Sequence, residues 1–382
     1  MSKTILYVDN RVKYVLSHRI PWLEGARDAG FDVHVTTLTA GPSSRIEDAG
    51  FAYHGIAEGG RSNNPVQELR LIVRLYQLYR ELQPDIVHHI TLRSILYGGI
   101  AASLLRSANI VNGVTGLGYL FSATDLKVRL LRTAVLLGLR LLPDRRMVYL
   151  FQNPDDERLF QRHRIVDPSS SVLIKGSGVD TDTFDVREEE PGPPVVLFPA
   201  RMLWHKGVRA FVDAARILTQ DGIGVRFVMV GDTDADNPAG VSAAQLEQWE
   251  DEGILEWWGY QDDMVDVFAQ SHIVCLPSAY REGVPKVLIE ASSCGRPIVT
   301  TDMPGCREIV QDGENGILVP PRDGKAVARA VRRLIQDPEL RREMGERGRA
   351  RVCKEFSIEH VVSSTLEAYE NLLAESAASP TH

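Results

Sequence analysis

Two basic side chains follow a strand-like run in the second half of the chain and precede a helical pattern. The run Val195–Phe198 is apolar, and Arg201 and Lys206 come after it. An arginine gives a phosphate two parallel hydrogen bonds, a lysine gives it a point charge, and a helix start adds free N–H groups. The spacing therefore predicts a diphosphate site, although a solvated pair of loop cations gives the same pattern.

Two carboxylates flank a second helix start, after the strand-like run Ile273–Leu276. Glu282 lies in a loop, and Glu290 lies one to two turns inside a helix that begins near Pro285. Both carboxylates can face one site and accept hydrogen bonds from sugar or ribose hydroxyls. The residues expected to bind substrate here are Glu290, Gly283, Val284, Pro285, Lys286, Val287 and Leu288, the last three through backbone N–H groups. A surface glutamate followed by a solvated helix residue is the alternative.

These residues resemble a known family. Arg201 with Lys206-Gly207, and Glu282 and Glu290 with seven residues between them, resemble the retaining glycosyltransferases of family 4, which have the GT-B fold. The stretches 295–302, 305–308 and 312–319 also look like that family, and the similarity is strongest from residue 195 to residue 320.

The resemblance implies catalytic roles. Arg201 and Lys206 would bind the donor diphosphate and neutralise the leaving nucleotide, Glu290 would hold the ribose, and Glu282 would contact the donor sugar near its reacting face. It implies retention at the anomeric carbon by front-face attack assisted by the leaving phosphate. No metal and no cofactor are expected, because arginine, lysine and a helix dipole stabilise the negative charge of the leaving diphosphate. The nucleotide-sugar donor is a substrate.

A metal alternative can be tested on the residues that follow the strand-like run Phe227–Val230. The sequence from Asp232 to Asn237 is rich in aspartate. Read as a calcium loop from Asp232, its sixth position is Asn237 instead of glycine and its twelfth is Ala243 instead of glutamate. We therefore favour a polar loop over a metal site.

The first half of the chain is less informative about chemistry. It lacks a G-x-G-x-x-G after its first strand-like run, which disfavours a dinucleotide site. Thr115 and Gly116 stand where many family members carry a His-Gly pair, so they are expected to bind substrate, but a threonine cannot be the same base. His18, near a helix start, and His88, at a strand end, are the remaining catalytic candidates, beside His89. A histidine in such a position is more often structural than catalytic.

A basic, leucine-rich segment spans residues 126–146. Its six cations, from Lys127 to Arg146, face only Asp144 and alternate with leucines. A helix of this kind can lie on an anionic membrane surface, or it can be an ordinary core helix with solvated arginines. The stretches 16–21, 85–89 and 115–119 resemble bacterial members that extend lipid-linked oligosaccharides for surface polysaccharides or protein glycans.

Apolar runs of strand length alternate with helical patterns from end to end. This predicts an α/β protein with two doubly wound domains facing a cleft, and the family resemblance implies that these are the two Rossmann-like domains of the GT-B fold. The boundaries expected are 1–186 for an acceptor-binding domain, 187–194 for a charged, proline-rich linker, and 195–356 for a donor-binding domain. A helix over 357–374 is expected to cross back onto the first domain.

Composition limits the class of protein further. The 382 residues carry a formal charge of −8, which argues against broad nucleic-acid binding. The four cysteines have no metal-ligand spacing and fit a reducing cytosol. No leader peptide and no membrane-spanning run are expected. The resemblance then places the protein in the cytoplasm, peripheral on the inner face of a bacterial plasma membrane.

The resemblance to bacterial members that extend lipid-linked oligosaccharides implies transfer of a sugar to a polyprenyl-diphosphate-linked saccharide, with an N-acetylhexosamine from UDP as the first choice of donor. The alternatives are a GDP-mannose-dependent mannosyltransferase, a sugar-nucleotide epimerase of the same fold, and a non-catalytic module that binds sugar nucleotides. Partners expected are the nucleotide-sugar donor, the lipid-linked acceptor and the membrane surface.

Overall fold

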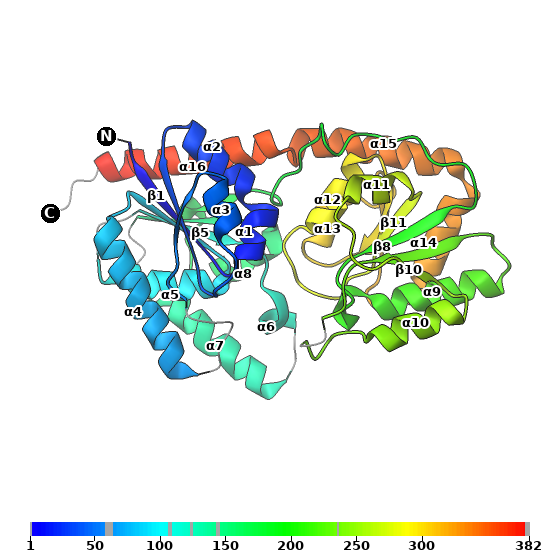
Figure 1. Ribbon diagram of the computed structural model, residues 1–382, viewed down its shortest axis with the longest axis horizontal. Helices are drawn as coiled ribbons and strands as arrows, with labels where there is room; N and C mark the ends of the chain where they lie inside the picture. Colours follow the sequence, from blue (N-terminus) through cyan, green and yellow to red (C-terminus); the bar gives the residue numbers. More distant parts are fainter. Residues whose placement is uncertain are drawn as a thin grey trace. The chain divides into compact units, whose positions relative to one another are not determined.

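The computed structural model describes residues 2–57, 64–105, 109–122, 125–142, 146–234 and 237–378. The chain divides into two compact units (Figure 1). The first contains Met1–Ser177 and Glu359–His382, and the second contains Gly178–Ile358. Each unit is built around a sheet whose strands all pair in parallel, so the predicted pair of Rossmann-like domains is confirmed.

The first unit has a seven-stranded sheet of order β3-β2-β1-β4-β5-β6-β7. Its central strands are apolar runs because helices bury both of their faces. The short edge strands β3 and β7 carry too few apolar residues to have been predicted. The strands are β1 (Thr4–Asp9), β2 (Asp32–Thr37), β3 (Ala52–His54), β4 (Ile86–Ile90), β5 (Asn109–Val114), β6 (Met147–Phe151) and β7 (Ser171–Leu173).

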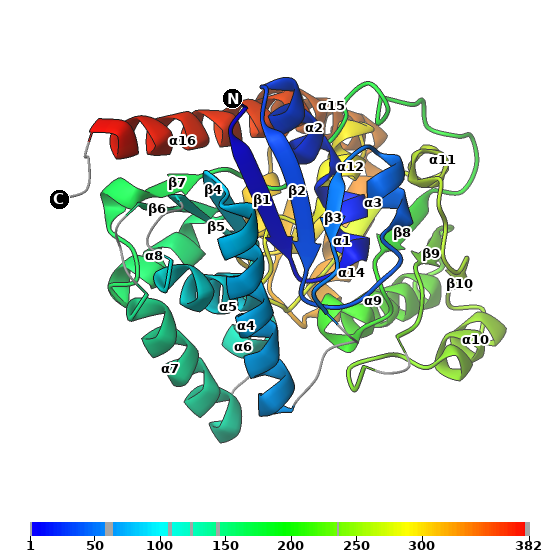
Figure 2. The ribbon, with the colours of Figure 1, turned by 60° about the vertical axis from the view of Figure 1, so that its left-hand side comes forward.

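Helices cover both faces of this sheet (Figure 2). On one face, side chains of α2 and α16 share a core with β1, β2 and β4. On the other face, α4, α5, α7 and α8 share a second core with the sheet. The helices of this unit are α1 (Val12–His18), α2 (Ile20–Asp28), α3 (Ser44–Asp48), α4 (Pro65–Leu82), α5 (Leu92–Ser103), α6 (Gly118–Ser122), α7 (Leu126–Arg140), α8 (Pro154–Arg162) and α16 (Ile358–Ala378).

The second unit has a six-stranded sheet of order β10-β9-β8-β11-β12-β13. A single core joins this sheet to its helices. The strands are β8 (Val195–Pro199), β9 (Arg226–Val230), β10 (Glu256–Trp257), β11 (Ile273–Leu276), β12 (Ile298–Thr301) and β13 (Gly316–Val319). The helices are η2 (Trp204–Lys206), α9 (Val208–Gln220), α10 (Ala243–Asp251), α11 (Met264–Ala269), α12 (Lys286–Ser293), α13 (Cys306–Ile309), α14 (Gly324–Gln336) and α15 (Pro338–Glu355).

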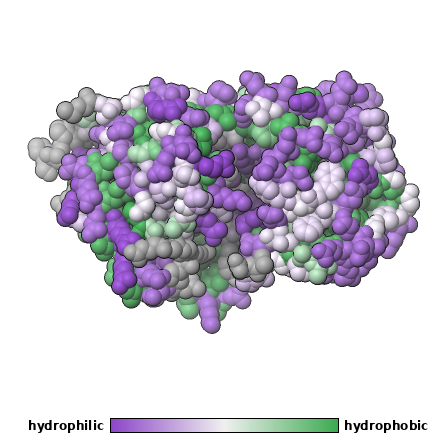
Figure 3. Space-filling view, viewed as in Figure 1, coloured by the Kyte–Doolittle hydropathy of each residue, from purple (hydrophilic) through white to green (hydrophobic). Residues whose placement is uncertain are grey.

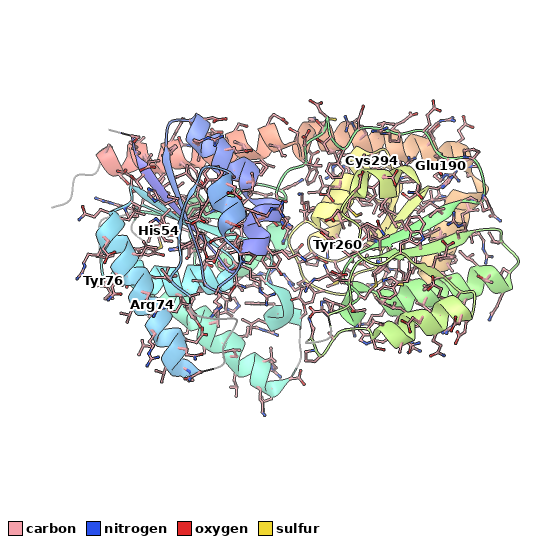
Figure 4. All side chains as sticks on the ribbon, viewed as in Figure 1. His54, Arg74, Tyr76, Glu190, Tyr260 and Cys294 are labelled. Atoms are coloured by element: carbon pink, nitrogen blue, oxygen red, sulfur yellow. The ribbon has the colours of Figure 1, made fainter. Side chains whose placement is uncertain are left out.

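The predicted linker over 187–194 belongs to the second unit, which begins at Gly178. Glu189 accepts two hydrogen bonds from Arg341, at 2.7 and 2.5 Å. The carbonyl of Glu190 lies 3.1 Å from Nε2 of His272, and Figure 4 marks Glu190 among the side chains of this unit. The proline-rich stretch is therefore anchored to the second unit by the carboxylate of Glu189 and the backbone carbonyl of Glu190, and the predicted boundary at 186 is wrong.

Candidate functional site

The predicted donor-site residues gather where the strand order of the second sheet reverses. β8 lies between β9 and β11, so the helices after β8 and β11 leave toward opposite faces of the sheet. Arg201 and Lys206 follow β8, and Glu282 follows β11. Ligands of open parallel sheets bind outside the carboxyl ends of the strands at this switch point.

Lys206 and Glu282 form the central ion pair of this site. Nζ of Lys206 lies 2.5 Å from Oε2 of Glu282, and the hydroxyl of Ser278 donates to Oε1 at 2.9 Å. Both charged side chains keep 16% of their surface exposed. The carboxylate is therefore fixed by a cation and a hydroxyl, while both partners remain within reach of a ligand.

Two glycines allow the loops of the site to approach one another. Gly207 has φ +93°, and a Cβ there would lie 2.0 Å from the carbonyl oxygen of Pro277. Gly305 has φ +87°, and its Cβ would lie 2.1 Å from the carbonyl oxygen of Gly283 and 2.5 Å from that of Glu282. No other residue type fits either position without a shift of the backbone. The loop that carries Glu282 therefore rests on the backbone of Gly305.

Side chains around the ion pair fix the same loop. The rings of His205 and Tyr280 lie with their centroids 4.4 Å apart, and the amide of Ala279 donates to the carbonyl of His205 at 2.9 Å. The hydroxyl of Thr301 donates to the carbonyl of Ser278. Burial, followed by the charge of Lys206, lowers the pKa of His205. The His205 imidazole is therefore uncharged, and the positive charge at this ion pair is that of Lys206.

Arg201 has a different partner. Its Nη1 lies 3.0 Å from Oδ2 of Asp234, and about half of the arginine side chain is exposed. Asn237 also donates to this carboxylate, at 3.3 Å. An exposed pair of this kind adds little stability, so the guanidinium can exchange the carboxylate for a phosphate at small cost. The aspartate-rich loop thus provides Asp234 as a partner for Arg201. Another aspartate of this loop, Asp236, lies outside the described residues.

Glu290 is placed on α12 with its side chain largely buried. Burial raises the pKa of this carboxyl, and Lys286 opposes that shift from 3.4 Å. Val284 and Leu288 turn their side chains into the core, so only their backbones can meet a ligand. Gly283 and Pro285 are buried as well, while Lys286 and Val287 are half-buried.

His88 in the first unit lies in the core. Its Nδ1 is 2.7 Å from the hydroxyl of Tyr369, and its ring stacks on Trp22 with 5.9 Å between centroids. Burial, then the charges of Arg19 and His89, hold its pKa well below the usual range. This environment argues against the predicted catalytic role.

The neighbouring His89 is also structural. It is fully buried between the Tyr79 hydroxyl, at 2.9 Å, and Oδ1 of Asn112, at 3.0 Å. Burial lowers its pKa to about 4.

The other candidates of the first unit are more accessible. His18 ends α1 half-buried, with its Nδ1 2.6 Å from the hydroxyl of Ser17. Thr115 and Gly116 follow β5 and are half-buried; Gly116 has φ +114°. Their predicted roles as base and substrate-binding residues stay predictions.

Some residues of the donor site were not expected from the sequence. Ser278 and Asp234 supply the second partner of Glu282 and the partner of Arg201. Their position in the loops that follow β11 and β9 was the available signal, because loops at the carboxyl ends of strands reach the site. Within the described ranges no group of three His, Cys, Asp or Glu residues is arranged to hold a metal ion.

Family comparisons match both units. Residues 4–142 match the family described as "Glycosyl transferase 4-like", and residues 180–351 match "Glycosyl transferases group 1". The chain is 25% identical to the N,N'-diacetylbacillosaminyl-diphospho-undecaprenol alpha-1,3-N-acetylgalactosaminyltransferase of Campylobacter jejuni, over 93% of this chain and 95% of the relative. It is 33% identical to the alpha-D-kanosaminyltransferase of Streptomyces kanamyceticus, over 43% of this chain and 42% of the relative.

Solved structures share the whole fold. HepE of Anabaena, in complex with UDP, is similar with a TM-score of 0.77 at 18% identity, over 97% of this chain and all of HepE. The sucrose-phosphate synthase of Thermosynechococcus elongatus is similar with a TM-score of 0.79 at 19% identity, over 98% of this chain and all of that enzyme. At these identities the likeness concerns the fold alone, which is the GT-B fold.

Proposed function

The chain belongs to the glycosyltransferases, its two units matching the 4-like and group 1 families, and from this premise we propose that it transfers a sugar from a nucleoside diphosphate to a lipid-linked saccharide. The observation that carries the proposal is the Lys206–Glu282 pair at the switch point of the second sheet. The full-length similarity to a transferase named for a diphospho-undecaprenol acceptor supports the acceptor class.

The chemistry follows from the charges. The bond between the anomeric carbon and the diphosphate oxygen breaks, the acceptor oxygen forms the new bond, and the acceptor proton passes to the departing diphosphate. An ammonium has three N–H donors, so Lys206 can hold Glu282 and still bind diphosphate oxygens. Arg201 can add a bidentate contact. Such fixed cations stabilise the negative charge of the leaving group, and the proposed reaction needs no metal.

Glu282 fits a role in binding the sugar. Both of its oxygens already accept a hydrogen bond, one from Lys206 and one from Ser278. A carboxylate nucleophile would have to approach the anomeric carbon to form a covalent intermediate. A carboxylate held in this way is better suited to accept hydrogen bonds from sugar hydroxyls than to form a covalent intermediate.

A nucleotide screen tests the donor site. UDP, GDP, ADP and dTDP are added with EDTA present, and the melting temperature is measured. We expect stabilisation by UDP, about 2.7 kcal/mol at one hundred times its dissociation constant. The shift should be lost in Arg201→Ala and retained in Arg209→Ala, an exposed arginine of α9. A shift with GDP alone would favour the mannosyltransferase alternative, and no shift with any nucleotide would contradict the donor site.

The lipid-linked acceptor requires contact with a membrane, and the surface of α7 supports it. Among the described residues, no helix is both long and apolar enough to span a bilayer. Five leucines of α7 and its C-cap are exposed, and the sequence of α7 holds four basic and no acidic residues. The exposed leucines are Leu126, Leu130, Leu131, Leu137 and Leu141. Such a helix can lie in an anionic interface.

Helix α4, which shares a core with α5 and α7, also exposes apolar side chains. The exposed residues of α4 are Val66, Leu69 and Val73, and Figure 3 shows hydrophobic and hydrophilic residues side by side on this part of the first unit. Figure 4 marks Arg74 and Tyr76 on α4. The other side of α7 turns Leu139 into the core, so the helix both packs and exposes leucines. Residues 143–145 of the predicted segment lie outside the described residues.

Replacing Leu130, Leu131 and Leu137 together by serine should reduce binding to vesicles. Each exposed leucine that enters the acyl boundary contributes hydrophobic energy of about 1.5 kcal/mol or more. We expect the fraction bound to phosphatidylglycerol vesicles in flotation to fall more than about tenfold. Leu173→Ser, at an exposed leucine of β7, is the matched control. Equal flotation of the triple variant and the control would contradict membrane contact through α7.

A further inference from the structure

The first unit repeats the strand order of the second. In both sheets the first strand lies between the second and the fourth, which places a switch point between β1 and β4 as well as between β8 and β11. In the second unit this point carries Arg201, Lys206 and Glu282. In the first unit, Asn10 follows β1 and Arg93 follows β4. The same topological argument therefore marks a second ligand position.

A polar cluster occupies this position. Nη2 of Arg93 donates to both carboxylate oxygens of Glu68 at 2.8 Å, and Nη1 donates to Oδ1 of Asn10 at 3.3 Å. The hydroxyl of Tyr97 donates to Glu68 at 2.5 Å, and the guanidinium lies 5.3 Å from the centre of the Tyr97 ring. Arg93 and Glu68 keep 16% and 19% of their side-chain surface exposed. The cluster is thus ordered and still accessible.

The backbone beside this cluster is strained. Thr91 has φ +82° and ψ +154°, a conformation that residues other than glycine rarely adopt. Its amide donates to the carbonyl of Gly113 at 3.0 Å, which holds the end of β4 against β5. The hydroxyls of Thr91 and Ser94 are buried and have no partner in the described part of the chain. Backbone strain of this kind clusters at ligand-binding sites, so it supports a functional role for this end of β4.

The charges of the cluster indicate the kind of ligand. Arg93 and Glu68 cancel one another, and burial with the bond to Glu68 raises the pKa of Tyr97, which keeps the phenol neutral. A neutral cluster with a carboxylate does not favour a diphosphate. It offers paired donors and acceptors and an aromatic ring, which suit the hydroxyls and the apolar face of a sugar ring.

We propose that Asn10, Glu68, Arg93 and Tyr97 form the binding site for the saccharide of the acceptor. This rests on the proposed function, because it names the residues that recognise the second substrate of the same reaction. The site selects an uncharged sugar through the N–H donors of the Arg93 guanidinium and the acceptor oxygens of the Glu68 carboxylate. The diphosphate and the lipid of the acceptor bind elsewhere.

The test separates acceptor from donor. UDP-N-acetylglucosamine is the donor, and undecaprenyl-diphosphate-linked N-acetylglucosamine is the acceptor. Glu68→Gln and Arg93→Lys should raise the KM for the acceptor about 10- to 100-fold, as loss of hydrogen bonds to charged groups does. The KM for the donor and the UDP melting shift should stay unchanged. Glu47→Gln and Arg158→Gln, exposed residues of α3 and α8, are the controls.

A binding measurement keeps the two proposals distinguishable. Saturation-transfer NMR with the methyl glycoside of N-acetylglucosamine, recorded with saturating UDP, should give a signal that Arg93→Gln and Tyr97→Phe abolish. If the wild type binds this glycoside but transfers no sugar, the proposed function fails and the saccharide site stands. If the wild type transfers sugar while Glu68→Gln and Arg93→Lys keep its acceptor KM, the saccharide site is wrong and the proposed function stands.

Discussion

Replacing Lys206 by alanine should lower the rate of sugar transfer about 10²- to 10³-fold, the usual effect of removing one fixed group that stabilises developing charge. Lys206 is the cation paired with Glu282, and its ammonium is the group we assign to the leaving diphosphate. The variant loses that stabilisation and also leaves a half-buried carboxylate without its cation. The measurement is the initial rate of transfer from UDP-N-acetylglucosamine, with the melting temperature as a check on folding.

The control variants separate charge from structure. Lys325→Ala removes an exposed lysine of α14 in the same unit and should keep full activity. Lys206→Ala combined with Glu282→Ala should restore the melting temperature lost in Lys206→Ala, because no unpaired charge remains, while transfer stays lost. If Lys206→Ala transfers sugar within about twofold of the wild type, the donor site is misassigned.

Replacing Gly305 by alanine should reduce both stability and transfer. The new Cβ would lie 2.1 Å from the carbonyl oxygen of Gly283, so the loop that carries Glu282 has to move. The positive φ adds a cost of about 1 kcal/mol. We expect the melting temperature to fall by more than about 5 °C. Transfer should fall more than about tenfold, as small displacements of positioning groups do.

Gly313→Ala is the matched control for this prediction. Gly313 also has a positive φ, +79°, but no described atom lies within 4 Å of its Cβ position. It therefore introduces the same backbone strain without the collision, and its melting temperature should fall by about 2–4 °C, with transfer unchanged. Equal losses in the two variants would mean that the contact between Gly305 and the Glu282 loop has no role.

The central strands could be predicted because their environment leaves a pattern in the sequence. β1, β8 and β11 are buried on both faces and are therefore nearly continuous apolar runs, and β4 differs only by the buried His88 and His89. β3, β7 and β10 have two or three residues each and lie at sheet edges, where no such run is required. Local sequence cannot predict a strand that forms only because it pairs with the adjacent strand.

The candidate site was predictable residue by residue but not in its pairing. The sequence placed Lys206 and Glu282 near strand ends, but which cation meets which carboxylate depends on the approach of two loops distant in sequence. His88 illustrates the opposite limit. It was expected at a strand end, but it lies in the middle of β4, and its ring packs against Trp22 and Tyr369. Periodicity does not tell which face of a doubly covered strand meets solvent.

The last helix of the chain has a consequence for synthesis. α16 supplies Val361, Tyr369 and Leu372 to the core of the first unit, and the Tyr369 hydroxyl meets both His88 and Tyr7. Chains fold as they leave the ribosome, from the N-terminus onward. The second unit, continuous from Gly178 to Ile358, is complete before α16 emerges. The first unit therefore acquires its full core last, because the apolar side chains that α16 covers stay exposed until α16 has been synthesised.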